Sequence, residues 1–330
     1  MKKFFTFLLV MLVFGATSSY AQATLLATLN HNDSISTFYG SSAFSNALNA
    51  ASSGDIITLS SGTFAAVDIT KSNLTIRGAG MDNDTINNRK PTIISGVLNL
   101  GLGTIDSKIT DLTIEGIYFN DRIHMQGNMD AINFIKNRFK YVDCVRTKGY
   151  HFDNLGFVNC KIADNIDMHS SDYSSGSFNN CVIGGNSISG GHFTFNNCIL
   201  NYSGEMPKYC EYQNCIIRSS TVTEGTSTYW NNLFITNTNT SIPYTNTKIS
   251  PDDEKVANLV GDYSDAKDYK LNEELKSLIK GTDGTEVGIY GGLMPFDPTP
   301  TNPQITKFNV ANKTDADGKL SVDIEVKVAE

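Results

Sequence analysis

Positive charge is scarce in this sequence, and charge of either sign is infrequent. Charged residues make up 18% of the 330 residues, and 34 acidic side chains against 26 basic ones give a formal net charge of −8. Because nucleic-acid phosphates demand a cationic surface, this composition argues against general nucleic-acid binding. The window from Arg122 to His151 reverses the balance locally, since its basic residues outnumber its acidic ones.

Long apolar runs are missing after the N-terminus. Residues 1–21 have the three parts of an export signal, namely lysines at positions 2 and 3, an apolar run over 4–15, and the small-x-small cleavage site Ser19-Tyr20-Ala21. No later stretch approaches the length of a transmembrane helix. We therefore expect an exported chain without membrane insertion, directed to the periplasm, the cell surface or the cell exterior, with a fold that begins at residue 22.

The sequence is rich instead in one short repeat, marked by Gly or Asn at the position where we expect a corner of the chain. Nine of these corner residues stand 17 to 22 residues apart: Gly78, Gly96, Gly116, Asn137, Asn159, Asn180, Asn197, Asn214 and Asn232. The residues two positions earlier are all large and apolar: Ile76, Ile94, Ile114, Ile135, Phe157, Phe178, Phe195, Tyr212 and Trp230. A repeat of about 20 residues is one coil of a solenoid, which buries its apolar face only against neighbouring coils. Gly and Asn tolerate the left-handed backbone of a corner, and stacked Asn side chains can hydrogen-bond along their column.

The positions after each corner predict what faces inward and outward. Apolar residues two positions after a corner should face outward and form a stripe: Leu98, Tyr118, Phe139, Val182, Ile199, Ile216 and Phe234. Because such a stripe is unusual for a monomer, either residues 236–296 or the C-terminal hairpin cover it, or it docks a protein partner or a second copy. Arg138 breaks the inward pattern. Either the register slips and Phe139 turns inward, or a buried arginine has a function.

The sequence also lacks the closely spaced cysteine pairs that are typical of metal sites. Four of the six cysteines, Cys160, Cys181, Cys198 and Cys215, each follow a corner asparagine, and neither a CxxC pair nor a histidine cluster accompanies them. Stacked parallel strands keep equivalent Cα atoms about 4.8 Å apart with parallel side chains, which suits a disulfide poorly. We expect a column of buried thiols, with disulfides between coils as the alternative.

The two ends of the repeat have their own patterns. Residues 43–51 have apolar residues at helical spacing and predict a helix that caps the first coil, and residues 265–280 predict a helix that covers the other end. Prolines make 297–303 a stiff linker. Two alternating strands follow within 304–330, a hairpin too small for its own core, which should lean on the solenoid or on a partner.

Several segments resemble the right-handed parallel β-helix superfamily of pectate lyases and chondroitinase B-type lyases, the pectin-lyase-like proteins. The segments that resemble the beginning and end of those proteins are 47–59, 61–64, 74–78, 268–271 and 284–292. The Pro-Phe-Asp-Pro sequence at 295–298 is similar to uncharacterised exported bacterial β-helix proteins. The resemblance implies an all-β fold over 22–296, a single-stranded right-handed parallel β-helix of about ten coils, with an N-terminal helical cap and a small C-terminal β appendage.

The same resemblance implies a complex, acidic polysaccharide as the partner, cleaved by lyase-type elimination. Such a lyase neutralises a uronate carboxylate with calcium or arginine and removes the neighbouring proton with a base. The basic window offers Arg146 and Lys148 as catalytic candidates and Arg122 and His151 for substrate binding. The alternative interpretation is that this window is a solvated cationic surface without a functional role.

A second set of candidates lies one coil further along. In Asn165-Ile166-Asp167-Met168-His169 the alternation turns Asp167 and His169 outward, where they could perform acid–base work or form an ordinary surface pair. The arginine/proline signature of pectate lyases is absent, as are the Asn-Thr-Asp and Gly-His-Gly motifs of polygalacturonases. No aspartate cluster supports calcium, so we expect neither a metal nor another cofactor. The competing class is a non-catalytic surface or adhesion protein.

Overall fold

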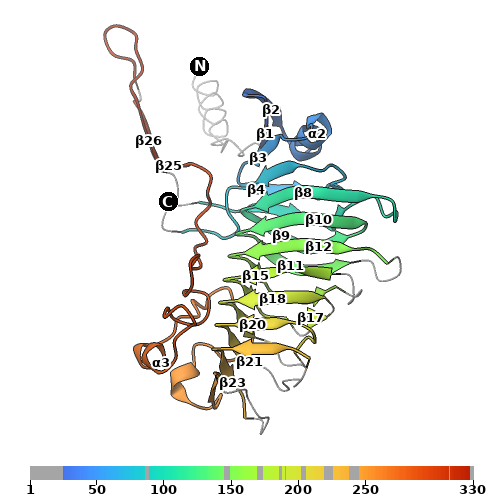
Figure 1. Cartoon of the computed structure of the whole chain (residues 1–330). Helices are drawn as coiled ribbons and strands as arrows, with labels where there is room; N and C mark the ends of the chain where they lie inside the picture. Colours follow the sequence, from blue (N-terminus) through green and yellow to red (C-terminus); the bar gives the residue numbers. More distant parts are fainter. Residues whose placement is uncertain are drawn as a thin grey trace, which may run out of the picture.

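The structure, a computed structural model, is a parallel β-helix of about eight turns and is mostly β (Figure 1). It describes residues 25–85, 89–144, 149–168, 174–185, 188–189, 191–201, 206–218, 226–237, 245–311 and 313–327. The predicted fold class is confirmed, although about ten coils were expected. One reason for the difference is Gly96, because Ile94 before it pairs with Phe119 in the second sheet and not with the Ile76 column.

One face of the solenoid is an 11-stranded sheet. Its order is β2 (Ser34–Tyr39), β1 (Leu26–His31), β3 (Ile56–Leu59), β5 (Leu74–Arg77), β8 (Lys108–Glu115), β10 (Asn128–Ile135), β12 (Phe152–Val158), β15 (Ser174–Asn179), β18 (His192–Asn196), β20 (Glu211–Gln213) and β22 (Thr228–Trp230). From β3 onward all neighbours are parallel, as coil stacking requires. The β1–β2 hairpin joins this sheet antiparallel and was not predicted from the sequence.

The other strands form a 13-stranded sheet. Its main order is β4 (Gly62–Ala65), β6 (Thr92–Ser95), β9 (Ile117–Met125), β11 (Arg138–Cys144), β13 (Lys161–Ile162), β16 (Val182–Ile183), β19 (Ile199–Asn201), β21 (Ile216–Arg218), β23 (Leu233–Ile235) and β24 (Thr247–Ile249). Beside the far ends of β9 and β11 lie β7 (Leu98–Leu100), β14 (Ile166–Asp167) and β17 (Ile188–Ser189). The far ends of β9 and β11, together with β14 of this second row of short strands, carry the candidate site described below.

The corner residues line up as predicted in most coils. Six of them have left-handed backbone: Gly96, Gly116, Asn159, Asn180, Asn197 and Asn214. The residue two positions earlier points inward, so aromatic rings stack through the core. Phe157 and Phe178 lie 4.4 Å apart between ring centroids, and Phe195 and Tyr212 lie 5.0 Å apart, with nearly parallel planes in both pairs.

Two coils depart from the predicted register by one residue. There the left-handed residue is Lys136 or Asn231, one position before the expected asparagine. The ring that points inward is therefore Phe134 or Tyr229, while Trp230 is 44% exposed. A slip of one residue exchanges the two faces of a strand.

The same slip explains Arg138. Phe139 is completely buried in the core, so the prediction that it faces outward is wrong and the register-slip interpretation is confirmed. Arg138 points outward, with its guanidinium 4.2 Å from the ring centroid of Tyr118. Two other residues expected to face outward are also internal. They are Phe234, which lies in the second slipped coil, and Leu98, which lies in β7.

The cysteine column is confirmed among the described residues. Cys160, Cys181, Cys198 and Cys215 are buried free thiols, as is Cys210. Each of the four donates from Sγ to a backbone carbonyl of the preceding coil, for example Cys181 to Phe157 O at 3.4 Å. These thiols thus fill core positions and satisfy their weak donors at the same time.

The N-terminal cap is confirmed. Helix α2 (Ala43–Ala50) buries Phe44, Ala47 and Leu48 against the first coils. The Lys71 amine donates to three carbonyls at the end of this helix, including that of Ala51 at 2.7 Å. A cation in this position complements the negative end of the helix.

The part of the chain that follows the last coil packs along one side of the solenoid, and not over its end as predicted. After η2 (Glu254–Val256) and the short α3 (Glu273–Leu278), residues 280–302 run back along the coils, and we call this segment the strap (Figure 1). A second apolar cluster joins the outward residues Val182, Ile199, Ile216 and Leu233 to Val256, Leu259, Leu275 and Val287, among others. The prediction that residues 236–296 cover the apolar stripe is confirmed for these coils.

The asparagine corners hold the strap in register. Asn180 and Asn197 donate to strap carbonyls, and Asn214 accepts from Thr282 N at 2.9 Å. The side-chain bonds of these corner asparagines therefore go to the strap, and not along the column as expected. At the far end Asn302 donates to Gly78 O at 2.7 Å, so the predicted linker at 297–303 is docked on the early coils.

The terminal hairpin forms as predicted, from β25 (Gln304–Val310) and β26 (Val322–Lys327). It is a separate two-stranded sheet that projects from the solenoid in Figure 1. Val322, Ile324 and Val326 are each about half exposed, so the solenoid does not cover them as expected. Within the described part of the chain, no helix is long and apolar enough to cross a membrane.

Candidate functional site

A column of polar side chains follows the second row of short strands. Three apolar–polar–apolar triplets carry it, with Ile123, Val142 and Ile166 completely buried inside the coils. The residues that follow them, His124, Asp143 and Asp167, are paired in register across neighbouring strands. Because the alternation of a strand turns successive side chains to opposite faces, all three lie on the outer side.

Asp143 is the centre of this column. Its Oδ1 lies 2.7 Å from Nδ1 of His124, and its Oδ2 lies 3.2 Å from Nη1 of Arg122. The carboxylate is only 10% exposed, whereas the Arg122 side chain is 44% exposed. The ion pair is thus shielded on the aspartate side and open to solvent on the arginine side.

The next coil adds a second carboxylate. Asp167 is 6% exposed, and its Oδ2 accepts a long hydrogen bond of 3.5 Å from the Tyr141 hydroxyl. The Tyr141 ring in turn lies under Arg122, with 5.0 Å between the guanidinium carbon and the ring centroid. Arg122, His124, Tyr141, Asp143 and Asp167 therefore form one connected network, which we call the carboxylate column.

The chemistry open to this network follows from its hydrogen bonds. A neutral His124 that donates from Nδ1 to Asp143 has its lone pair on Nε2, which is the form of a general base. Arg122 can bind a carboxylate or another oxyanion through its exposed nitrogen atoms. Among the described residues, no group of three or more His, Cys, Asp or Glu side chains is arranged to hold a metal ion.

The predicted site residues are distributed unevenly. Arg122 and Asp167 both belong to the carboxylate column. His151 is exposed and lies just before β12. Its backbone N–H donates to Asn128 Oδ1 at 2.9 Å. Arg146, Lys148 and His169 lie outside the described residues, so they stay predictions.

Two further cations of the basic window bind segments from the C-terminal part of the chain. Lys136 donates to Asp297 Oδ2 at 3.0 Å and to Thr299 O at 2.8 Å. Arg138 forms an ion pair with Asp265, and its second acidic neighbour is Asp82. These two cations are therefore structural contacts rather than parts of a free cationic surface.

Sequence reasoning missed His124, Tyr141 and Asp143. The signal that could have found them is the recurrence of the triplets Ile123-His124-Met125, Val142-Asp143-Cys144 and Ile166-Asp167-Met168, spaced 19 and 24 residues apart. That spacing is one coil, and a polar residue between two apolar ones marks the outer face.

Comparison of the chain with family models, with curated proteins and with solved structures finds no match.

Proposed function

We propose that this protein is exported and binds an acidic polysaccharide at the carboxylate column, and that it cleaves the polymer there by elimination. The observation that carries the proposal is the contact of Asp143 with both His124 and Arg122, beside a second shielded carboxylate on the next coil. A cation open to solvent next to an oriented imidazole supplies the two functions that uronate elimination needs.

In the proposed reaction Arg122 pairs with the uronate carboxylate and so acidifies the adjacent C5–H. Nε2 of His124 removes this proton, and the released electron pair forms the C4=C5 double bond. The C4–O glycosidic bond breaks, and its oxygen takes a proton to become the hydroxyl of the released chain. We assign the donation of that proton to Tyr141, whose hydroxyl is hydrogen-bonded to Asp167.

Asp143 acts in this scheme as a positioning residue. Its hydrogen bond holds the His124 tautomer that keeps the lone pair on Nε2, and its charge stabilises the imidazolium that forms during the reaction. Arg146, Lys148 and His169 are further candidates, because they follow β11 and β14 directly in the chain.

A second candidate is a non-catalytic binding protein that uses the coils as a scaffold. The observation that favours it is the mutual pairing within the column, since Arg122 and His124 both already contact Asp143. Paired groups of this kind also occur in purely structural networks.

The test is a screen of the purified mature protein against polygalacturonate, alginate, hyaluronan and chondroitin. Elimination produces a C4=C5 double bond conjugated with the uronate carboxylate, and this product is detected by its ultraviolet absorbance. Co-sedimentation with the same polymers detects binding without turnover. If none of these polymers is cleaved or bound, the proposal is refuted. If a polymer is bound but not cleaved, the non-catalytic candidate is favoured.

Two variants and a control connect any activity to the column. His124→Gln should lower kcat by a factor of about 100 or more, because it removes the proposed base. Arg122→Gln should raise KM and also lower kcat, since it removes the carboxylate partner that acidifies the C5–H. Asp153→Asn changes an exposed carboxyl in β12 and should leave both parameters unchanged.

A further inference from the structure

A cavity lies between the C-terminal part of the chain and the 13-stranded sheet. Its volume is about 320 Å³. The sheet contributes Lys161 and Val182. The rest of the lining comes from residues 265–270 and 289–298, which we call the covering segments, and includes Lys267, Lys270, Tyr290 and Phe296. This volume falls at the lower end of the range of about 300–1,000 Å³ that is typical of small-molecule sites.

Aromatic rings form part of the lining. The Tyr290 hydroxyl donates to Asp268 O at 2.7 Å, which fixes the ring in place. The Phe296 ring centroid lies 5.7 Å from Nζ of Lys161, and the Tyr290 centroid lies 5.9 Å from Nζ of Lys270. Rings held in this way present flat apolar faces next to cations.

The charge of the lining is opposite to that of the whole protein. Three lysines, Lys161, Lys267 and Lys270, line the cavity together with two aspartates, Asp265 and Asp268. The lining is therefore cationic in a chain whose formal net charge is −8. A local reversal of this kind favours an anionic ligand.

Two of these charges are already paired with groups outside the lining. Lys161 donates to Asp82 Oδ2 at 2.7 Å, so with both pairs set aside Lys267 and Lys270 stand against Asp268. Asp265 is engaged from outside the lining, by Arg138 and by the Tyr263 hydroxyl. Lys267 donates to the carbonyl oxygens of Val260 and Asp262, which are neutral acceptors.

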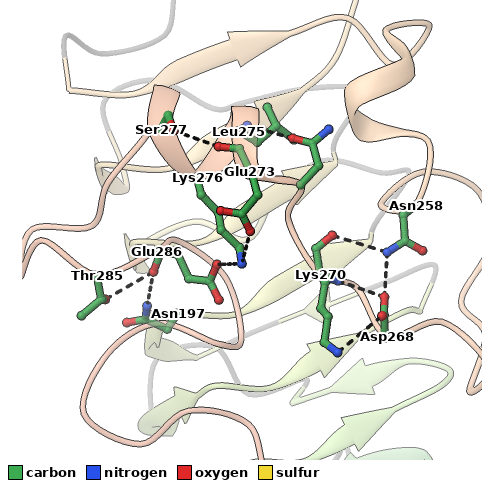
Figure 2. A network of polar contacts seen from close by, with 11 residues as sticks. Asn197, Asn258, Asp268, Lys270, Glu273, Leu275, Lys276, Ser277, Thr285 and Glu286 are labelled. Atoms are coloured by element: carbon green, nitrogen blue, oxygen red, sulfur yellow. Dashed lines mark hydrogen bonds and ion pairs between the residues drawn. The ribbon is translucent and has the colours of Figure 1, made fainter.

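Lys270 is the most accessible of these cations. Its side chain is 63% exposed, and its Nζ lies 3.8 Å from Asp268, a separation too long for a hydrogen bond (Figure 2). Asn258 already donates to the same carboxylate at 2.8 Å. Lys270 can therefore turn to a ligand without leaving Asp268 unpartnered.

We propose that this cavity binds one carboxylated pyranose unit, that is, a single uronate residue at the end of a chain or free in solution; the choice of sugar rests on the function proposed above. The rings of Tyr290 and Phe296 pack against the C–H faces of the sugar, and Lys270 pairs with its carboxylate. The site is separate from the carboxylate column, because its lining comes from the covering segments and from β13 and β16. It would serve to bind a product or to anchor a chain end.

The experiment is calorimetric titration of the full mature chain with D-galacturonate and, separately, with D-galactose. The two sugars differ only in the carboxylate, so the proposal expects the uronate to bind more tightly, by a factor on the order of 10. Equal binding of the two sugars, or no heat with either, would overturn it.

Three variants locate the site. Lys270→Ala and Phe296→Ala should each weaken galacturonate binding several-fold, and Lys319→Ala, an exposed change in the terminal hairpin, should leave binding unchanged. Full binding by both cavity variants would show that the sugar binds elsewhere and would refute the assignment.

Discussion

Asn180 joins a coil corner to the strap through two hydrogen bonds. Its Nδ2 donates to Ile289 O at 2.9 Å and to Gly291 O at 2.8 Å, across more than 100 residues of sequence. The side chain is buried, and its own backbone is left-handed, with φ of 52°. One residue thus serves both the corner and the attachment of the strap.

Two substitutions at this position separate its two roles. Asn180→Gly keeps the left-handed backbone but removes both hydrogen bonds, and we expect it to lower the free energy of unfolding by about 2 kcal/mol. Asn180→Ala adds the cost of a left-handed alanine, about 1 kcal/mol more. Urea unfolding followed by circular dichroism measures both. Equal stability of the wild type and the glycine variant would contradict the role given to the strap.

Arg138 should be a stabilising residue, not a catalytic one. It pairs with Asp265 of the covering segment and stacks on Tyr118. Arg138→Met leaves a partly buried carboxylate without its cation, so we expect a loss of about 2–3 kcal/mol. Asp265→Asn in the same background should recover part of that loss, as a double-mutant cycle in chemical denaturation would show. A fully additive cycle would mean that the two side chains do not interact.

Glu115 should make stability depend on pH. Burial raises the pKa of this carboxyl above its ordinary value, and the nearby Arg77 offsets this only in part. A carboxyl whose folded pKa exceeds its unfolded pKa binds its proton more tightly in the fold. Its contribution to stability is therefore present below the unfolded value, near 4.5, and is lost as the pH rises through the folded pKa.

Glu115→Gln tests this sign directly. At pH 7 the variant should be slightly more stable than the wild type, by about 0.5–1 kcal/mol, because a neutral amide replaces a buried charge. The difference should vanish near pH 4. Thermal unfolding at several pH values measures it, and a variant that is less stable at pH 7 would indicate that the ion pair with Arg77 outweighs burial.

The cysteine column predicts slow thiol chemistry. Cys160, Cys181, Cys198, Cys210 and Cys215 are buried, so an aromatic disulfide reagent should reach them only after unfolding. In native buffer, reaction of these five thiols should be slower than in denaturant by a factor of about 100 or more, in line with the free energy of opening. Rapid native labelling of two or more thiols per chain would show that the column is open.

The repeat made most of the fold predictable, but its exact register was not. At Asn137 and Asn232 the asparagine does not take the left-handed conformation. Asn137 instead buries its amide, which donates to Ile114 O and accepts from Ile117 N. These bonds compensate for placing Lys136 in a conformation that costs a lysine about 1 kcal/mol. Because both contacts come from the preceding coil, the short pattern alone does not reveal them.

The site was predictable in part for a similar reason. Arg122 and Asp167 were identified from charge and alternation, but His124 and Asp143 stand 19 residues apart and match no motif. Their contact depends on how many residues each coil contains, which varies from coil to coil. A change of one residue in that number would turn one of the two side chains into the core.

The sequence by itself determined that the chain winds into stacked parallel coils, because regularly spaced corners and inward apolar residues leave a repeating chain no other way to bury its surface. It also determined the thiol column and the presence of the terminal hairpin. Only the tertiary structure decided which residue turns each corner, how the strap closes over the apolar stripe, and which polar residues meet in the carboxylate column. Those outcomes depend on contacts between residues one coil or many coils apart, and local patterns do not contain that information.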